Sequence, residues 1–189
     1  MIKSVTKKKS SETVLDLTYV ALGAVLIAIC SWISIPAAVP FTLQTFAVAF
    51  VLLTLGGRRG TLSIIIYILL GAIGIPVFSQ FSAGIGVLLG TTGGYIIGFI
   101  LMGLVYWIMT QLFSKTLWMK VLASVVGLAI CYSFGTIWFM TVYAKNSGAI
   151  GISTALAWCV VPFVIPDHIK LALAVVISRR VSSAIKIDY

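Results

Sequence analysis

The side chains of this chain that could do chemistry are few, and three of them lie together in an apolar stretch. Asp167, His168 and Lys170 occur within Val-Ile-Pro-Asp-His-Ile-Lys-Leu-Ala-Leu-Ala. Ionisable groups in such segments are costly, and they usually mark a functional path or pair with each other. Asp167 and Lys170 are three residues apart, so on a helix they share one face. We expect both to contact a ligand. The alternative is an interfacial pair, with Asp167 at a helix N-terminus and Lys170 extending toward headgroups.

Two irregular stretches carry further polar candidates. Residues 39–45, Val-Pro-Phe-Thr-Leu-Gln-Thr, place an amide and hydroxyls beside an aromatic ring, and residues 76–94 contain five glycines and no charge. Irregular backbone at membrane depth is tolerated only where it packs in protein or lines a cavity. A tight structural turn is the alternative for residues 76–94. Each polar group here is as suited to capping a helix as to binding a ligand. The candidates are Phe41, Thr42, Gln44, Gln80, Thr92 and Tyr95.

Several kinds of site are not expected. The sequence has no phosphate loop, no zinc-protease motif and no nucleophile elbow, and it has only four acidic residues and one histidine. Its three cysteines are far apart, without metal-ligand or redox spacing. His168 points to another face than Asp167 and lacks companions for a metal. We therefore expect no enzyme, no catalytic residue, no metal and no cofactor.

The composition indicates a membrane protein. Of 189 residues, 61% are hydrophobic and 9% charged, with a mean hydropathy of +1.18. A chain this short cannot bury so much apolar surface within itself, so the excess must face lipid. We predict an all-α integral membrane protein, a bundle of six transmembrane helices. The expected helices are Leu17–Ser34, Thr42–Leu55, Gly60–Ile75, Tyr95–Leu112, Val121–Val142 and a sixth that starts near Asp167, with Pro166 at its start, and continues to Ile177 or beyond.

The basic residues predict the orientation. Eleven of them fall before the first helix and in alternate connections, whereas Lys145 is the one clear cation in the others. This asymmetry is typical of cytoplasmic loops and makes nucleic-acid binding implausible. Residues 1–16 are then a basic cytoplasmic segment and 17–189 a single membrane domain, with both termini cytoplasmic. The two irregular stretches and the start of the sixth helix meet on the outer side, where we predict a ligand pocket.

The first helix also carries small residues at helical spacing. Ala21, Ala24 and Ala28 follow this pattern, with Gly23 adjacent. Small residues let helices approach closely in lipid. This face is a candidate interface with a partner helix, and packing inside the bundle is an equal alternative.

Four segments, taken in order, resemble the BioY family of biotin-binding S components of energy-coupling factor (ECF) transporters. They are residues 39–45, 71–78 (Gly-Ala-Ile-Gly-Ile-Pro-Val-Phe), 89–95 (Leu-Gly-Thr-Thr-Gly-Gly-Tyr) and 162–170 (Pro-Phe-Val-Ile-Pro-Asp-His-Ile-Lys). The resemblance covers residues from about 17 to 180. Thr91 and Pro166 depart from the proline and glycine that are usual in the family.

The resemblance implies an importer subunit in a bacterial plasma membrane. It also implies that biotin is the transported ligand, and that the partners are a membrane scaffold (T) subunit and two ATPase (A) subunits, which would supply the missing phosphate loop. Asp167 would accept the ureido N–H groups, with Gln80 and Gln44 as further ring partners. Lys170 would bind the ureido oxygen or balance Asp167, and Phe41, Phe78 and Tyr95 would cover the ring system. A self-sufficient secondary transporter or channel is the alternative.

Overall fold

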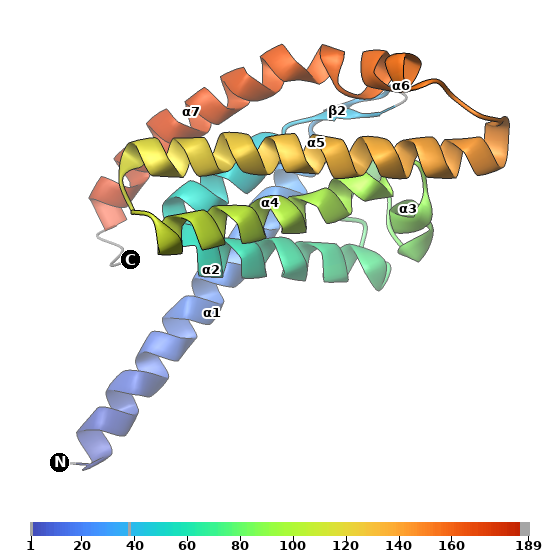
Figure 1. The fold of residues 1–189 in the computed structure, drawn as a ribbon. Coiled ribbons are helices and arrows are strands. Elements are labelled where there is room, and N and C mark those ends of the chain that lie inside the picture. The colour runs from blue at the N-terminus through green and yellow to red at the C-terminus, as the bar shows by residue number, and fades with distance from the viewer. Residues whose placement is uncertain (1, 38, 186–189) are drawn as a thin grey trace.

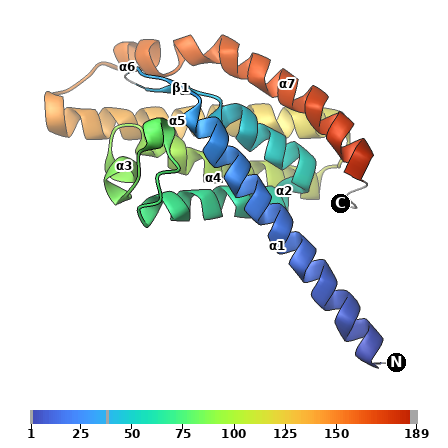
Figure 2. The same ribbon diagram turned by 180° about the vertical axis from the view of Figure 1, so that it is seen from behind.

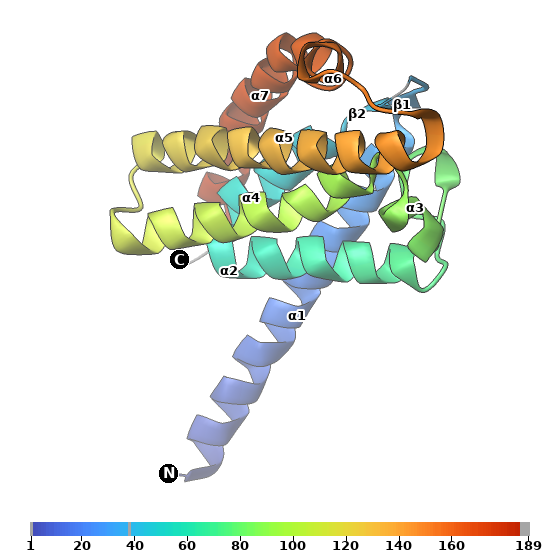
Figure 3. The same ribbon diagram turned by 45° about the vertical axis from the view of Figure 1, so that its right-hand side comes forward.

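The computed structural model describes residues 2–37 and 39–185, which are mostly helical. Helices α2, α4 and α5 form neighbouring rows, and α7 lies along a further side of this bundle (Figures 1 and 3). Helix α1 crosses the face of the bundle that is turned to the viewer in Figure 2, and its first half extends away from the rest of the chain. The elements are α1 (Ile2–Trp32), β1 (Ser34–Ile35), β2 (Phe41–Thr42), α2 (Gln44–Ala72), the 3-10 helix η1 (Ser79–Phe81), α3 (Ile85–Leu89), α4 (Gly93–Leu112), α5 (Leu117–Ser147), α6 (Ile152–Cys159) and α7 (Val161–Ile185).

Helix α2 is interrupted by a reversal of the chain at Gly56. This glycine has φ 81° and ψ 171°, a conformation that glycine adopts without a steric penalty. Beyond it, Gly60 packs directly on Leu52, so the two halves of α2 lie against each other. The predicted break is therefore present. With α2 taken as one helix, however, the described residues contain five helices long and apolar enough to cross a membrane, not the six expected.

Two helix starts differ from those expected. Helix α1 begins at Ile2 rather than Leu17, and α7 begins at Val161 rather than near Asp167. Pro162 occupies the first turn of α7, where a proline costs no hydrogen bond. Pro166 lies inside α7 and lacks the N–H that would bond to the carbonyl of Pro162. Asp167 is therefore held within a helix rather than at its end.

The proline-rich turn after α1 forms a short antiparallel hairpin. Ser34 pairs with Thr42, and Ile35 pairs with Phe41. The backbone N–H of Leu43 then donates to the carbonyl of Ile33 over 3.1 Å. These bonds hold residues 39–42 against the bundle, at the end opposite the Gly56 reversal.

Glycines allow the closest helix contacts. A β-carbon at Gly94 would strike Trp138, and one at Gly135 would strike the ring of Tyr95, so α4 and α5 approach through positions without side chains. Gly71 in α2 lies equally close to the ring of Phe78.

Gly71→Ala should lower the free energy of unfolding by about 1–3 kcal/mol, because the added methyl group overpacks the contact with Phe78. Thermal unfolding of the detergent-solubilised protein measures this change. Gly86→Ala is the matched control, since a β-carbon at this position would meet no atom within 4 Å and φ is not positive there. Equal melting temperatures for the two variants would contradict the prediction.

Candidate functional site

The two irregular stretches and the first half of α7 meet around one cavity of about 70 Å³. This convergence is the arrangement expected from the sequence. Helix α4 and helix α5 complete the walls. The lining residues are Val39, Pro40, Thr42, Gln44, Thr45, Ser79, Thr92, Tyr95, Ile96, Phe99, Leu128, Cys131, Tyr132, Cys159, Phe163, Asp167 and Lys170.

A buried ion pair forms the polar centre of this cavity. Lys170 Nζ lies 2.7 Å from Asp167 Oδ1, and the side chains are only 7% and 4% exposed. The second carboxylate oxygen, Oδ2, accepts a hydrogen bond of 2.6 Å from the hydroxyl of Tyr132 on α5. Such burial excludes the alternative of an interfacial pair that extends toward headgroups. Both carboxylate oxygens are satisfied, as a charge in a low-dielectric site requires.

Lys170 also joins α7 to the hairpin. Its ammonium donates to the carbonyl of Thr42 over 2.7 Å and lies 3.9 Å from the centre of the Phe41 ring. A cation over an aromatic face is attracted by the ring quadrupole. Phe41 in turn stacks on Phe163 at 5.9 Å. Phe41 is therefore a support for Lys170, although it is not among the lining residues.

Other polar groups of the cavity are held by further hydrogen bonds. Gln44, at the start of α2, donates through Nε2 to the hydroxyl of Tyr67 over 3.0 Å, and its own N–H bonds to Thr42 Oγ1. The hydroxyl of Tyr95 lies 2.9 Å from Thr136 Oγ1. Gln44 and Tyr95 are thus pre-oriented beside Asp167, and the carbonyl group of the Gln44 amide is available as an acceptor.

Phe78 and Gln80 do not line the cavity. Phe78 is fully buried, with its ring edge-to-face with Tyr67 at 5.6 Å, whereas Gln80 is exposed and has φ 56°. The turn that carries them is fixed to α1, because Ser31 and Trp32 donate to the carbonyls of Val77 and Pro76. Of the nine ligand contacts expected from the sequence, six line the cavity: Thr42, Gln44, Thr92, Tyr95, Asp167 and Lys170.

Tyr132 is a site residue that the sequence analysis missed. It lies in an apolar stretch of α5, Ile-Cys-Tyr-Ser-Phe, where a tyrosine resembles an ordinary core residue. Its phenol could have indicated the site, because a hydroxyl group deep in a spanning helix needs a hydrogen-bond partner. Charged acceptors are few in this chain, so Asp167 was a candidate partner. Cys131, Cys159 and Phe163 line the cavity as apolar wall.

The remaining predicted residues lie elsewhere. His168 is exposed, and its Nδ1 lies 2.7 Å from the carbonyl of Val164. Within residues 2–37 and 39–185, no group of three or more His, Cys, Asp or Glu residues could hold a metal ion. Ala24 and Ala28 pack in the core of the bundle, and Ala21 is exposed on α1. For Ala24 and Ala28 the structure thus favours packing inside the bundle.

Comparison with known sequences assigns the family. A model of the BioY family matches residues 4–187, nearly the whole chain. The chain belongs to the BioY family. The biotin transporter BioY of Thermotoga maritima is 42% identical over 156 residues, which cover 82% of this chain and 88% of that protein. The biotin transporter BioY2 of Lactococcus lactis is 39% identical over 163 residues, 85% of this chain and 86% of that one.

A solved BioY-like structure agrees with the fold. The crystal structure of an S-component for biotin from an ECF-type ABC transporter superposes with a TM-score of 0.80 at 27% sequence identity. The match covers 92% of this chain and 93% of that chain. These BioY relatives are named as transporters rather than as enzymes.

Lys170→Met should cost roughly 3–5 kcal/mol of folding free energy, because it leaves the Asp167 carboxylate buried without its counter-ion. Asp167→Asn should be costly for the same reason. The double variant should be clearly more stable than the sum of the two losses predicts, since the two changes remove one shared interaction. Chemical or thermal unfolding of all four proteins in detergent measures the coupling. Additive losses would show that the two charges do not depend on each other.

Proposed function

We propose that this chain is the biotin-binding S subunit of an ECF-type vitamin importer. The observation that supports this most is the buried Asp167–Lys170 pair, which faces a cavity in a chain whose relatives are named biotin transporters. Biotin enters from the extracellular side and is delivered to the cytoplasm. No covalent step is involved, so no catalytic residue or cofactor is required.

The chemistry of biotin matches this cavity. Its ureido ring offers two N–H donors and one carbonyl acceptor, and its bicyclic body is mostly apolar. In this proposal Asp167 accepts the ureido N–H groups, and Gln44, Thr92 and Tyr95 line the same cavity. Charge-assisted hydrogen bonds in a dry pocket are the strong ones. Lys170 either donates to the ureido oxygen or keeps Asp167 balanced.

The cavity must enlarge when biotin binds. Its volume of about 70 Å³ is several times smaller than the roughly 300–1,000 Å³ that is typical of ligand pockets. Val39, Pro40 and Thr42 line the cavity outside any α-helix, and Phe41 stacks on Phe163, which also lines it. We expect these groups to move while α4 and α5 remain in place.

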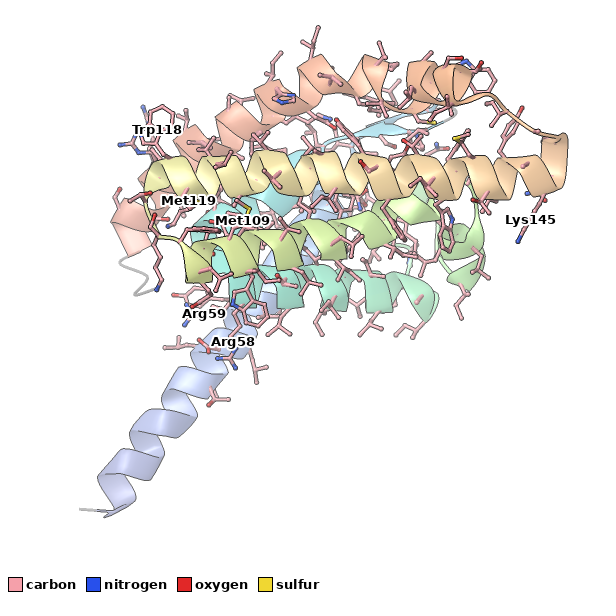
Figure 4. The ribbon with its side chains drawn as sticks, in the orientation of Figure 1. Arg58, Arg59, Met109, Trp118, Met119 and Lys145 are labelled. Atoms are coloured by element: carbon pink, nitrogen blue, oxygen red, sulfur yellow. The ribbon has the colours of Figure 1, made fainter. Side chains whose placement is uncertain are left out.

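The distribution of basic residues supports one orientation of the chain in the membrane. Arg58 and Arg59 lie at the same end of the bundle as the start of α5, whereas Lys145 lies at the opposite end (Figure 4). This asymmetry supports an orientation with the basic end in the cytoplasm and the ligand cavity on the outer side. If each half of α2 crosses the membrane, the chain has six crossings and both termini are cytoplasmic.

The partners proposed are a T scaffold subunit and two A subunits that hydrolyse ATP. The sequence offers no phosphate loop with which this chain could do so itself. The exposed face of α1, which includes Ala21, is available to a scaffold helix. The rival function, a self-sufficient transporter or channel, needs a coupling-ion or conduction path, for which the charged side chains that line the cavity are Asp167 and Lys170.

Asp167→Asn should weaken biotin binding by at least about tenfold, and by more than Gln44→Ala does, because it removes the charged acceptor. Isothermal titration of the purified proteins with biotin measures both losses. His168→Gln should remain within about twofold of the parent protein, because this neighbouring side chain is exposed and faces away. Equal losses for Asp167→Asn and Gln44→Ala would contradict the ranking, and no biotin binding by the parent protein would overturn the function.

Biotin uptake by cells should require all three kinds of subunit. A strain without its own biotin uptake, given this chain together with scaffold and ATPase subunits, should accumulate labelled biotin. The same strain with ATPases inactivated in their phosphate loops should bind biotin at its surface without accumulating it. Sustained uptake by this chain alone would support the self-sufficient transporter instead.

A further inference from the structure

A second pocket, of about 220 Å³, lies between α1, α2, α4 and α5 at the end opposite the ligand cavity. Its walls include the Gly56 reversal of α2 and the connection between α4 and α5. None of its lining residues is shared with the ligand cavity. They are Asp16, Leu55, Gly56, Gly57, Arg58, Arg59, Tyr106, Thr110, Gln111, Lys115 and Lys120.

The charge of this basic pocket is strongly unbalanced. Four cationic side chains line it against the single carboxylate of Asp16. Asp16 is already used, because Arg59 Nη2 lies 2.5 Å from its Oδ1. Arg59 also lies 5.7 Å from the ring centre of Tyr19. Arg59 is thus fixed in position, and the pocket keeps an excess of positive charge.

Helix termini add to this excess. The second half of α2 starts at the Gly56 reversal, where Gly57 and Arg58 line the pocket, so its positive N-terminal end lies there. Helix α5 also starts beside the pocket, with no acidic residue in its first turn but with Lys120. A cation at a helix N-terminus is unfavourable. Two helix N-termini and four cations therefore converge on one pocket, where a bound anion would be stabilised by all of them.

The residues around the pocket indicate which anion would be available to it in a membrane. Leu112, Phe113 and Trp118 beside the α4–α5 connection are 73%, 68% and 85% exposed. In a membrane protein, such residues at a helix end lie at the boundary between acyl chains and headgroups. Figure 4 shows Trp118 at the same end of the bundle as Arg58 and Arg59. Trp118 at a helix end favours a position of the pocket near the level of lipid phosphates, and the exposed apolar side chains nearby could contact an acyl chain.

We propose that the basic pocket binds the headgroup phosphate of an anionic phospholipid from the cytoplasmic leaflet. Basic pockets between membrane helices on this side are suited to such headgroups. Arg58 and Lys115 contact the phosphate, and the N-terminal end of the second half of α2 stabilises its charge. The bound lipid neutralises the end of the bundle where α1, α2, α4 and α5 converge.

The test uses the purified full chain in neutral detergent, titrated with phosphatidylglycerol or with phosphatidylethanolamine of the same acyl chains. Native mass spectrometry counts the retained lipids, and thermal unfolding reports the stabilisation. The parent protein should retain one phosphatidylglycerol in preference to phosphatidylethanolamine. The double variant Arg58→Gln/Lys115→Gln should bind it at least about tenfold more weakly. Biotin binding should be unchanged in this variant, which also shows that it is folded.

The matched control is Arg179→Gln/Arg180→Gln. It removes the same charge from exposed residues of α7 that do not line the pocket, so phosphatidylglycerol retention should equal that of the parent protein. Equal losses in both double variants would overturn the proposal, because they would indicate general attraction between charges. Complete displacement of the lipid by an equal concentration of glycerol phosphate or inorganic phosphate would also overturn it, because the site would then bind a soluble phosphate rather than a lipid.

Discussion

The arrangement of the ligand cavity depends on one interaction, the buried ion pair of Asp167 and Lys170. Neither charge can remain inside a lipid-embedded bundle without full hydrogen bonding. The carboxylate of Asp167 therefore accepts a hydrogen bond from Tyr132 on α5. The ammonium of Lys170 donates to the carbonyl of Thr42 in the hairpin, and these two residues are 128 positions apart in the sequence. Three segments far apart in the chain thus meet because two charges require partners. Asp167 and Lys170 both lie on one face of α7, which starts at Val161, well before Asp167.

The two ends of the bundle differ in the balance of their charges. At the cavity end, one anion and one cation neutralise each other within 2.7 Å, and the surrounding wall is apolar or neutral. At the Gly56 end, cations outnumber carboxylates and two helix N-termini add to their field. An anionic inner leaflet attracts the cations of the Gly56 end, and this attraction favours an orientation with that end in the cytoplasm. In the proposed orientation, the charges that set the topology in the membrane also set which end meets a soluble ligand.

The sequence identified the chemistry of the cavity better than its geometry. Asp167 and Lys170 were predictable because charge is rare in an apolar chain, and Thr42, Gln44, Thr92 and Tyr95 because they flank breaks in helices. Phe78 and Gln80 lie in a turn whose path depends on Ser31 and Trp32, contacts 46 and 44 residues away that no local pattern reveals. Tyr132 was missed because a phenol inside an apolar helix has the same local pattern as a core residue. The start of α7 was misplaced because two prolines, Pro162 and Pro166, both fit a first turn, and only tertiary packing decides between them.

A buried ion pair by itself contributes little to the stability of a protein. Replacing such a pair with apolar side chains of similar volume is often neutral or stabilising, so its presence in this cavity is better explained by what the charges do for a ligand. A ligand with both donors and an acceptor can exchange hydrogen bonds with Asp167 and Lys170 without leaving either charge unsatisfied. An apolar molecule of the same shape would have to separate the pair or leave it untouched, and a site built to hydrogen-bond rejects analogues that lack the matching groups by large factors. Under the proposed function, selectivity for a ureido-like ring follows from the cost of unpaired charge, because a ligand without matching groups would leave Asp167 or Lys170 without a partner.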